Sequence, residues 1–258
     1  MKKWYVTILL LGISLLSGCN YSDTHQRTGL VYQLVVGPMD GLLHYLGLHL
    51  NHNYGLAIVI IVCLVRLILM PLMLHNQKQM AITSMKMKEL QPKIEPIQQK
   101  MKAAATQQLK NEAYQELQQL YQQHQLNPLT TMFGCLPMLI QIPILFGLYA
   151  TLKWPTSGGI LSYPTFMWFH LTSPDSMIAM IAGFMYFVQS WLSARQMPKE
   201  QRMMGYVMMI VSPLFILYIA FQSPSALALY WFVNAALLIL QAIISQRQTH
   251  HIRQSKTM

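Results

Sequence analysis

The chain has 258 residues, of which 53% are hydrophobic and only 10% are charged, and its formal net charge is +10. Ordinary soluble domains carry about 25% charged residues, so this composition argues against a soluble domain and favours a membrane protein. Because the basic residues gather between long apolar stretches, the positive charge indicates membrane topology and not nucleic-acid binding.

The first 18 residues have the form of a lipoprotein signal peptide. Lys2 and Lys3 give a basic start, and residues 4–16 form an apolar stretch too short to span a membrane. The sequence Leu16-Ser17-Gly18-Cys19 resembles a bacterial lipobox, which implies cleavage before Cys19 and a lipid on its thiol. The alternative is an uncleaved signal anchor with an incidental cysteine. Lipidation would hold the mature N-terminus on the outer face of the cytoplasmic membrane.

Residues 19–53 are predicted to form a lipid-anchored extracellular segment. Between residues 28 and 52, Leu42, Leu43, Leu46 and Leu50 follow helical spacing. This pattern predicts an amphipathic helix on the outer membrane surface, and a plain extracellular loop is the alternative.

Five apolar stretches are long enough to cross about 30 Å of hydrocarbon. They cover residues 54–74, 128–152, 177–194, 203–221 and 226–244. With the N-terminus outside, five crossings leave the C-terminus and a short basic tail, residues 245–258, in the cytoplasm. Only Arg27 and Lys153 then lie outside. The cytoplasmic basic residues, which support this orientation by the positive-inside rule, are Lys78, Lys86, Lys88, Lys93, Lys100, Lys102, Lys110, Arg195, Lys199, Arg202, Arg247, Arg253 and Lys256.

Residues 75–127 form the one sizeable polar region and predict a cytoplasmic helical hairpin. Apolar residues repeat every seven positions in its first arm, and a second apolar face follows in the second arm. Pro92 and Pro96 are expected to kink or break the first arm. Both a mobile hairpin and a rigid coiled coil are compatible with this pattern. The two apolar faces consist of Met80, Met87, Leu90, Ile94, Ile97 and Met101, and of Ala113, Leu117, Leu120 and Tyr121.

Arg66 is a charged residue inside the first predicted span. It lies roughly 18 Å from the outer end of that span and roughly 12 Å from the inner end. Burial of an arginine at the membrane centre costs from about 2.5 to about 17 kcal/mol, depending on the reference, and such residues usually face a bundle interior or a wet cavity. None of the eight acidic residues lies in a predicted span. Arginine does not deprotonate, so water and neutral dipoles must solvate it.

Neutral polar side chains in the other spans are available for that purpose. The sequence therefore predicts a hydrophilic cavity within the bilayer that holds an unpaired cation; the alternative is an arginine that snorkels to the cytoplasmic headgroups and only fixes helix depth. The candidate dipoles are Gln141, Gln189, Ser190, Asn234 and Gln241.

Catalytic and metal sites are not indicated. The spans hold no paired aspartates, no Ser/His arrangement and no zinc-ligand cluster, and no Gly-rich phosphate loop occurs. Cys63 and Cys135 lie in apolar stretches. Both are expected to be small, buried, apolar side chains, and no disulfide is expected. We therefore predict neither an enzyme nor a cofactor.

Four segments resemble motifs of the YidC/OxaA family of membrane protein insertases. Residues 134–143, Gly-Cys-Leu-Pro-Met-Leu-Ile-Gln-Ile-Pro, followed by Leu148-Tyr149, resemble its second-span motif, and Asn127-Pro128 ahead of them also fits. Residues 224–231, Pro-Ser-Ala-Leu-Ala-Leu-Tyr-Trp, with Asn234 and Gln241, resemble its last-span motif. Residues 85–94, and Arg66-Leu67 with Pro71, fit the first arm of its hairpin and its first-span arginine. The resemblance runs in order from residue 54 to 244.

The resemblance implies an all-α membrane protein with a groove open to the cytoplasm and to lipid. Arg66 would attract acidic residues in a substrate's translocated tail, Gln141 and Trp231 would line the groove, and Tyr230 would contact the incoming helix. The alternatives are ordinary interhelical hydrogen bonding for Gln141 and an interfacial aromatic belt for Tyr230 and Trp231. The implied location is the bacterial cytoplasmic membrane, as a multi-pass protein.

The expected function is insertion and folding of nascent membrane proteins, alone or with the Sec translocon. Family members with long basic tails use them at the ribosome, and the short tail here leaves that contact open. Two other functions stay compatible with the residues: an anion or solute transporter that uses Arg66, and an assembly chaperone for membrane complexes.

Overall fold

The computed structural model describes residues 32–124, 126, 136–154, 158–197 and 202–255. The predicted signal peptide and Cys19 lie outside these residues. The chain divides into two compact units: the first comprises residues up to 68 together with 140–240, and the second comprises residues 69–139 together with those from 241 onward.

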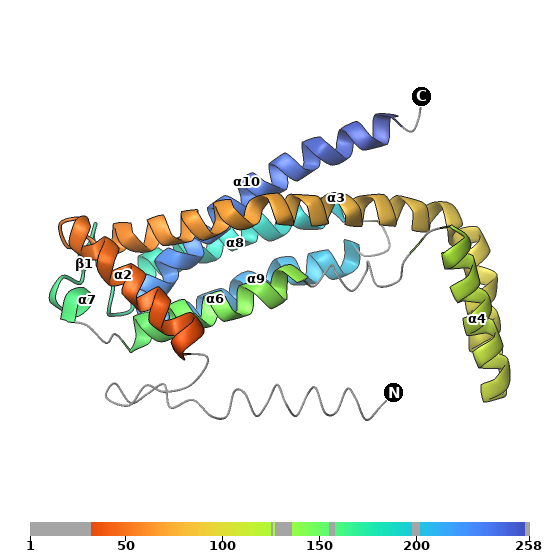
Figure 1. The fold of residues 1–258 in the computed structure, drawn as a ribbon, viewed down its shortest axis with the longest axis horizontal. Coiled ribbons are helices and arrows are strands. Elements are labelled where there is room, and N and C mark those ends of the chain that lie inside the picture. Colours follow the sequence, from red (N-terminus) through yellow and green to blue (C-terminus); the bar gives the residue numbers. More distant parts are fainter. Residues whose placement is uncertain (1–31, 125, 127–135, 155–157, 198–201, 256–258) are drawn as a thin grey trace. The chain divides into compact units, whose positions relative to one another are not determined.

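Long helices dominate the first unit (Figure 1). They are α3 (Tyr54–Ala103), α6 (Leu136–Lys153), α8 (Ser176–Gln196), α9 (Arg202–Ala220) and α10 (Ser225–Ser255). Within the described residues, α3, α8, α9 and α10 are long and apolar enough to cross a membrane. The prediction of a helical membrane protein is therefore confirmed, and these four helices coincide with the first, third, fourth and fifth predicted spans.

The second predicted span, residues 128–152, is only partly described. Helix α6 begins at Leu136, and residues 127–135 lie outside the described part. A fifth membrane crossing by this segment stays a prediction.

Pro92 and Pro96 do not break the first arm, and a kink at these residues stays a prediction. Helix α3 runs without interruption through Pro71, Pro92 and Pro96 as far as Ala103. A proline inside a helix costs about 3 kcal/mol. Around Pro92 and Pro96, buried Leu90, Ile94 and Ile97 alternate with the prolines along the helix. Their burial stabilises the turns on either side, and tertiary packing of this kind commonly overrides intrinsic helix propensity.

Short elements gather at the end of the first unit where α3 begins (Figure 1). A helix lies in the predicted amphipathic segment, and its place on the membrane surface stays a prediction. A small antiparallel hairpin pairs Thr165 with His170 and Phe166 with Phe169, and no sequence pattern had indicated it. These elements are η1 (Tyr32–Val36), α2 (Gly37–His49), α7 (Gly158–Ser162), β1 (Thr165–Phe166) and β2 (Phe169–His170).

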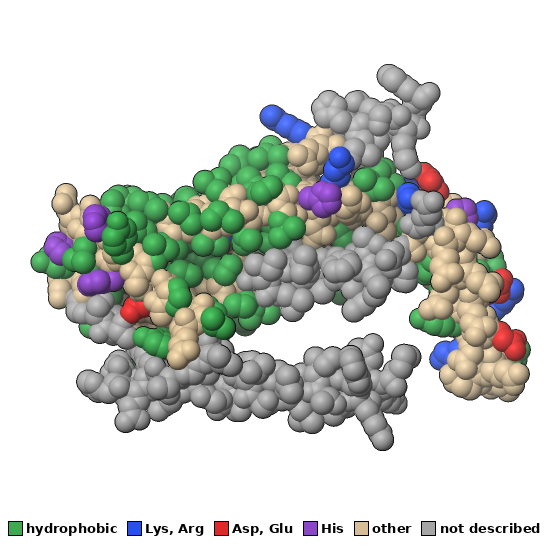
Figure 2. Space-filling view, viewed as in Figure 1, with side chains coloured by type: hydrophobic (Ala, Val, Ile, Leu, Met, Phe, Trp, Pro, Cys, Tyr) green, Lys and Arg blue, Asp and Glu red, His purple; other side chains and the backbone are tan. Residues whose placement is uncertain are grey.

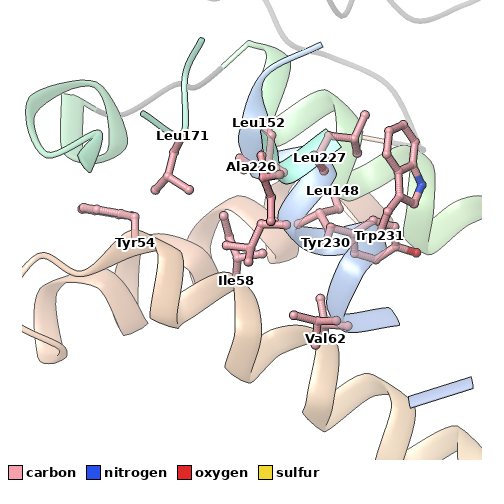
Figure 3. Packing of buried hydrophobic residues seen from close by; sticks show 14 of the residues in the cluster. Tyr54, Ile58, Val62, Leu148, Leu152, Leu171, Ala226, Leu227, Tyr230 and Trp231 are labelled. Carbon is pink, nitrogen blue, oxygen red and sulfur yellow. The ribbon is translucent and has the colours of Figure 1, made fainter. Parts of the chain in front are cut away.

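The core of the first unit lies between α3, α6 and α10 (Figure 3). Ile58 and Val62 of α3 pack in the same cluster as Leu148 of α6 and Leu227 of α10. On α10, Ala226, Ala228 and Ala235 are fully buried. Small residues let membrane helices approach closely, which explains how α10 packs closely at the centre of the unit.

Tyr54, the first residue of α3, fixes the short elements to the core. Its ring is buried and packs so tightly against Gly47 of α2 and Gly159 of α7 that a Cβ at either glycine would overlap it. His52, in the preceding turn, stacks on Tyr163 with 4.2 Å between ring centroids. One end of the helical core is therefore capped by tightly packed aromatic contacts.

In the second unit, α4 (Gln107–Gln123) packs against the last part of α3. Thr106 caps α4 by accepting a hydrogen bond from the backbone N–H of Leu109, and the exposed Lys100–Glu116 ion pair spans 3.1 Å. Burial in the small cluster between the helices raises the pKa of the Tyr121 hydroxyl. The buried residues of this cluster, with those packed on it, are Leu90, Ile94, Leu126, Leu117, Leu120 and Tyr121.

The heptad seam is correct in its later part. Leu90, Ile94 and Ile97 are buried, whereas Met80 and Met87 are exposed. Figure 2 shows hydrophobic side chains over much of the first unit, and Lys, Arg, Asp and Glu side chains around α4. This distribution suits lipid around the first unit and water around the second. The cytoplasmic position of the helix pair stays a prediction.

Candidate functional site

Arg66 lies on α3 with only 7% of its surface exposed. Its Nε donates a hydrogen bond of 2.6 Å to Oδ1 of Asn234, which is buried on α10. As predicted, a neutral dipole solvates this arginine. The hydrogen bond joins two helices that lie far apart in the sequence.

Asn234 continues the network to a third helix. Its Nδ2 donates a hydrogen bond of 2.8 Å to the hydroxyl of Tyr186 on α8. The orientation of the Asn234 amide is therefore fixed at both ends, with its oxygen toward the guanidinium and its nitrogen toward Tyr186. A buried polar group held on both sides positions its neighbours firmly.

Arg66 forms no ion pair with any described residue; its one hydrogen-bond partner there is neutral. Among the described side chains the guanidinium thus remains an uncompensated positive charge, because arginine keeps its proton under all ordinary conditions. A buried charge with only neutral partners is energetically costly, and such residues within membrane spans mark functional sites.

Gln141 and Tyr230 form a second polar contact. Nε2 of Gln141, on α6, donates a hydrogen bond of 2.8 Å to the hydroxyl of Tyr230 on α10. Two predicted site residues thus meet directly. The contact is also an interhelical hydrogen bond, the alternative considered for Gln141.

Both polar pairs face one pocket of about 260 Å³, a volume that includes its open mouth. The polar side chains come from α3, α6 and α10, and the rest of the lining is apolar. The enclosed part has room for about one water molecule. The lining residues are Met39, Ile61, Val62, Val65, Arg66, Gln141, Ile144, Leu148, Tyr230 and Asn234.

Trp231 does not line this pocket. It is buried next to Tyr230 in the hydrophobic core (Figure 3). The structure therefore brings together Arg66, Gln141 and Tyr230 and places Trp231 in the packing behind them.

Tyr186 and Met39 are among the residues of the site that were not predicted. Tyr186 appears in the sequence as one aromatic residue in an apolar span, and only the fold reveals that it accepts from Asn234. Met39 reaches the pocket from α2, a helix outside the predicted spans. Gln189 and Ser190, two of the candidate dipoles, form hydrogen bonds within α8 instead. Gln189 donates to Ser193, and Ser190 donates to Gln189.

Within the described residues, no group of three or more His, Cys, Asp or Glu side chains could hold a metal ion. Cys63 is a free, partly buried cysteine.

Comparison with known proteins now gives these residues a family. Residues 45–253 match the family described as 60Kd inner membrane protein. The chain is 49% identical over 243 residues to the membrane protein insertase YidC of Staphylococcus aureus strains JH9, Newman and JH1. Each alignment covers 93% of this chain and 84% of the relative. The chain therefore belongs to the 60Kd inner membrane protein family, the YidC/OxaA family of membrane insertases, which are not enzymes.

Proposed function

We propose that this protein inserts other proteins into the membrane, and that Arg66 is the residue on which acidic parts of a substrate dock. The observation that carries the proposal is the burial of Arg66 at the end of a neutral hydrogen-bond chain, from Arg66 through Asn234 to Tyr186, that joins α3, α10 and α8. The names of the Staphylococcus aureus relatives support the same role.

An acidic tail would supply the charge that the described residues do not. Two opposite unit charges 4 Å apart attract by about 4 kcal/mol at an effective dielectric constant of 20, against about 1 kcal/mol in water. The attraction is therefore worth most where water is scarce, as in the pocket beside Arg66. Asn234 and Tyr186 would hold the guanidinium in place while its charge remains available.

The enclosed pocket is far too small for a polypeptide. We therefore propose that the site acts as part of a groove that widens when a substrate arrives, with Gln141 and Tyr230 on its wall. Hydrophobic partitioning of the substrate's own span and the membrane potential would complete the transfer. No covalent step is involved.

The remaining sequence predictions complete the proposal. The chain would carry a lipid on Cys19 outside the cell, cross the cytoplasmic membrane five times, and place α4 with the end of α3 in the cytoplasm. Nascent membrane proteins, the Sec translocon and the ribosome are the proposed partners.

Insertion into liposomes tests the role of Arg66. In this assay, external protease no longer cleaves the translocated tail of a substrate that has inserted. Arg66→Ala is expected to lower insertion of acidic-tailed substrates at least tenfold, about 1.4 kcal/mol. Arg66→Lys keeps the charge and is expected to retain most activity. Neutralising the substrate tail should remove the difference between wild type and Arg66→Ala.

Two results would contradict this role. Wild-type insertion by Arg66→Ala would reduce Arg66 to a residue that sets helix depth. Equal loss in Arg66→Lys and Arg66→Ala would indicate a specific bidentate anion site. Saturable anion uptake by protein-containing liposomes would then favour the transporter.

A further inference from the structure

The segment between α6 and α8 is unusual for a connection between membrane helices. From residue 154 to residue 174 it contains no Asp, Glu, Lys or Arg. Connections that face water are normally polar, because water solvates polar and charged side chains well and apolar side chains poorly. The composition of this segment points to a surrounding that is only partly water.

Its hairpin is tied to the beginning of α10. The backbone N–H of Ser225 donates to the carbonyl of Ser173 at 2.9 Å, and that of Ala226 donates to the carbonyl of Leu171 at 3.0 Å. The hydroxyl of Ser225 also donates to the carbonyl of His170 at 3.0 Å. These bonds fix the end of the hairpin at the first turn of a membrane helix.

The hairpin is also packed on the first turn of α3. The ring of Phe166 lies against Gly55, where a Cβ would overlap it. The ends of two apolar helices thus set the depth of the hairpin. Apolar helices of this kind reach the membrane–water interface at their ends, and the hairpin lies at the ends where α3 and α10 begin.

The two sides of the hairpin differ. Phe169 and Leu171 are buried in the core of the first unit, whereas Met167 is 71% exposed and Trp168 is 48% exposed. Met167 has a φ of 54°, a conformation uncommon for residues other than glycine. The turn therefore presents a methionine and a tryptophan outward from a rigid base.

We propose that Met167 and Trp168 insert into the headgroup and carbonyl layer of the bilayer, on the side where α3 and α10 begin. Tryptophan prefers this layer because its ring is apolar and its indole N–H can hydrogen-bond. Lipid is the proposed partner of these two side chains. The hairpin is held at the ends of two helices that span the membrane, and its exposed tip therefore lies next to the bilayer. The proposal rests on the membrane-spanning helices and not on the insertase function.

Depth-dependent fluorescence quenching tests this contact in the full chain, reconstituted in liposomes. The emission of Trp168 is the difference between a chain carrying Trp154→Phe and Trp191→Phe and the same chain with Trp168→Phe added. Lipids brominated near the headgroup are expected to quench this emission more than lipids brominated near the chain end, and aqueous iodide is expected to quench it weakly.

A matched control uses α4, which is exposed in the second unit. Tyr114→Trp, in the chain that carries all three Trp→Phe changes, is expected to respond to iodide and not to brominated lipid, because Tyr114 is 53% exposed on a polar helix.

Three outcomes would overturn the proposal. Strong quenching of Trp168 by iodide alone would place it in water. Resistance to both quenchers would mean that protein covers it, either another part of this chain or a second molecule. Stronger quenching from the chain ends would place it in the hydrocarbon interior. None of these results bears on insertion by Arg66, which the protease-protection assay measures separately.

Discussion

At the scale of single residues, Asn234 is the described residue that accepts a hydrogen bond from Arg66. Its neutral oxygen holds the guanidinium without cancelling the charge, while its nitrogen is engaged by Tyr186. An aspartate is almost the same size and would supply the missing negative charge at the same 2.6 Å contact.

Asn234→Asp is therefore expected to act like the loss of Arg66. Insertion of acidic-tailed substrates should fall at least tenfold, about 1.4 kcal/mol, because an internal ion pair competes with the substrate. Substrates with neutral tails should be affected much less. The protease-protection assay measures insertion of both kinds of substrate.

Tyr186→Phe is the matched control. It removes the acceptor of Asn234 and adds no charge, so a loss of about 1 kcal/mol in stability is expected without a preference between tails. Full activity of Asn234→Asp toward acidic tails would contradict the docking role.

The sequence predicted the buried charge but not all its partners. Arg66 was recognisable because an arginine inside an apolar span needs a special environment whatever the fold. Which dipoles it meets depends on how each helix is rotated about its axis, and an almost uniformly apolar span carries little information about that. Asn234 was thus one of several candidates, while Tyr186 resembled any lipid-facing aromatic residue.

At the scale of elements, the contact of Tyr54 with two glycines joins α2, α3 and α7. An added Cβ would meet different atoms at the two glycines: at Gly159 it would meet the hydroxyl and then Cζ, whereas at Gly47 it would meet ring carbons only. The hydroxyl is also buried without a hydrogen-bond partner among the described residues. Substitutions can therefore distinguish the contact of Tyr54 with Gly159 from its contact with Gly47.

Gly47→Ala and Gly159→Ala are each expected to destabilise the protein by about 1–3 kcal/mol through overpacking. Adding Tyr54→Phe should recover part of the loss for Gly159→Ala, whose Cβ would still meet Cζ, and little for Gly47→Ala, because it removes only the hydroxyl. Thermal unfolding midpoints in detergent give the comparison.

Gly41→Ala provides the control on α2. No atom lies within 4 Å of its added Cβ, so a gain of about 0.5–1 kcal/mol from reduced chain entropy is expected. Equal behaviour of Gly41→Ala and Gly47→Ala would refute the packing argument.

Elements were predictable to different degrees for physical reasons. Long apolar stretches locate α3, α8, α9 and α10 because the bilayer requires about 20 apolar residues. The hairpin at residues 165–170 is too short for a periodic pattern, and backbone bonds to α10 hold it. Pro92 and Pro96 do not break α3, because the buried residues around them offset the local cost of a proline in a helix.

At the scale of the whole molecule, the division into two compact units predicts that they separate in function. Replacing residues 78–123 by a short flexible linker removes α4 and most of the second unit's part of α3. The first unit is expected to remain folded, because its core residues all lie outside the deleted segment. Insertion should fall if this segment captures substrates. Thermal unfolding and the protease-protection assay report the two properties independently.

Glu116→Gln is the control for that deletion. It breaks the exposed Lys100–Glu116 pair, whose contribution to stability is expected to be below about 1 kcal/mol, and it should leave insertion unchanged. Failure of the shortened chain to fold would show that the segment is a structural brace.

The unequal burial of the spans also determines how freely the sequence can vary. Within its most apolar stretch, α10 is 56% buried and α9 only 22%. Saturation mutagenesis is expected to find that α9 accepts most apolar replacements outside Gly205, Pro213 and Ala220. On α10, residues larger than alanine at positions 226, 228 and 235 should be rejected, because each is fully buried and extra methylenes cannot be accommodated. Sequence drift in this protein should therefore collect on α9, the less buried of the two helices.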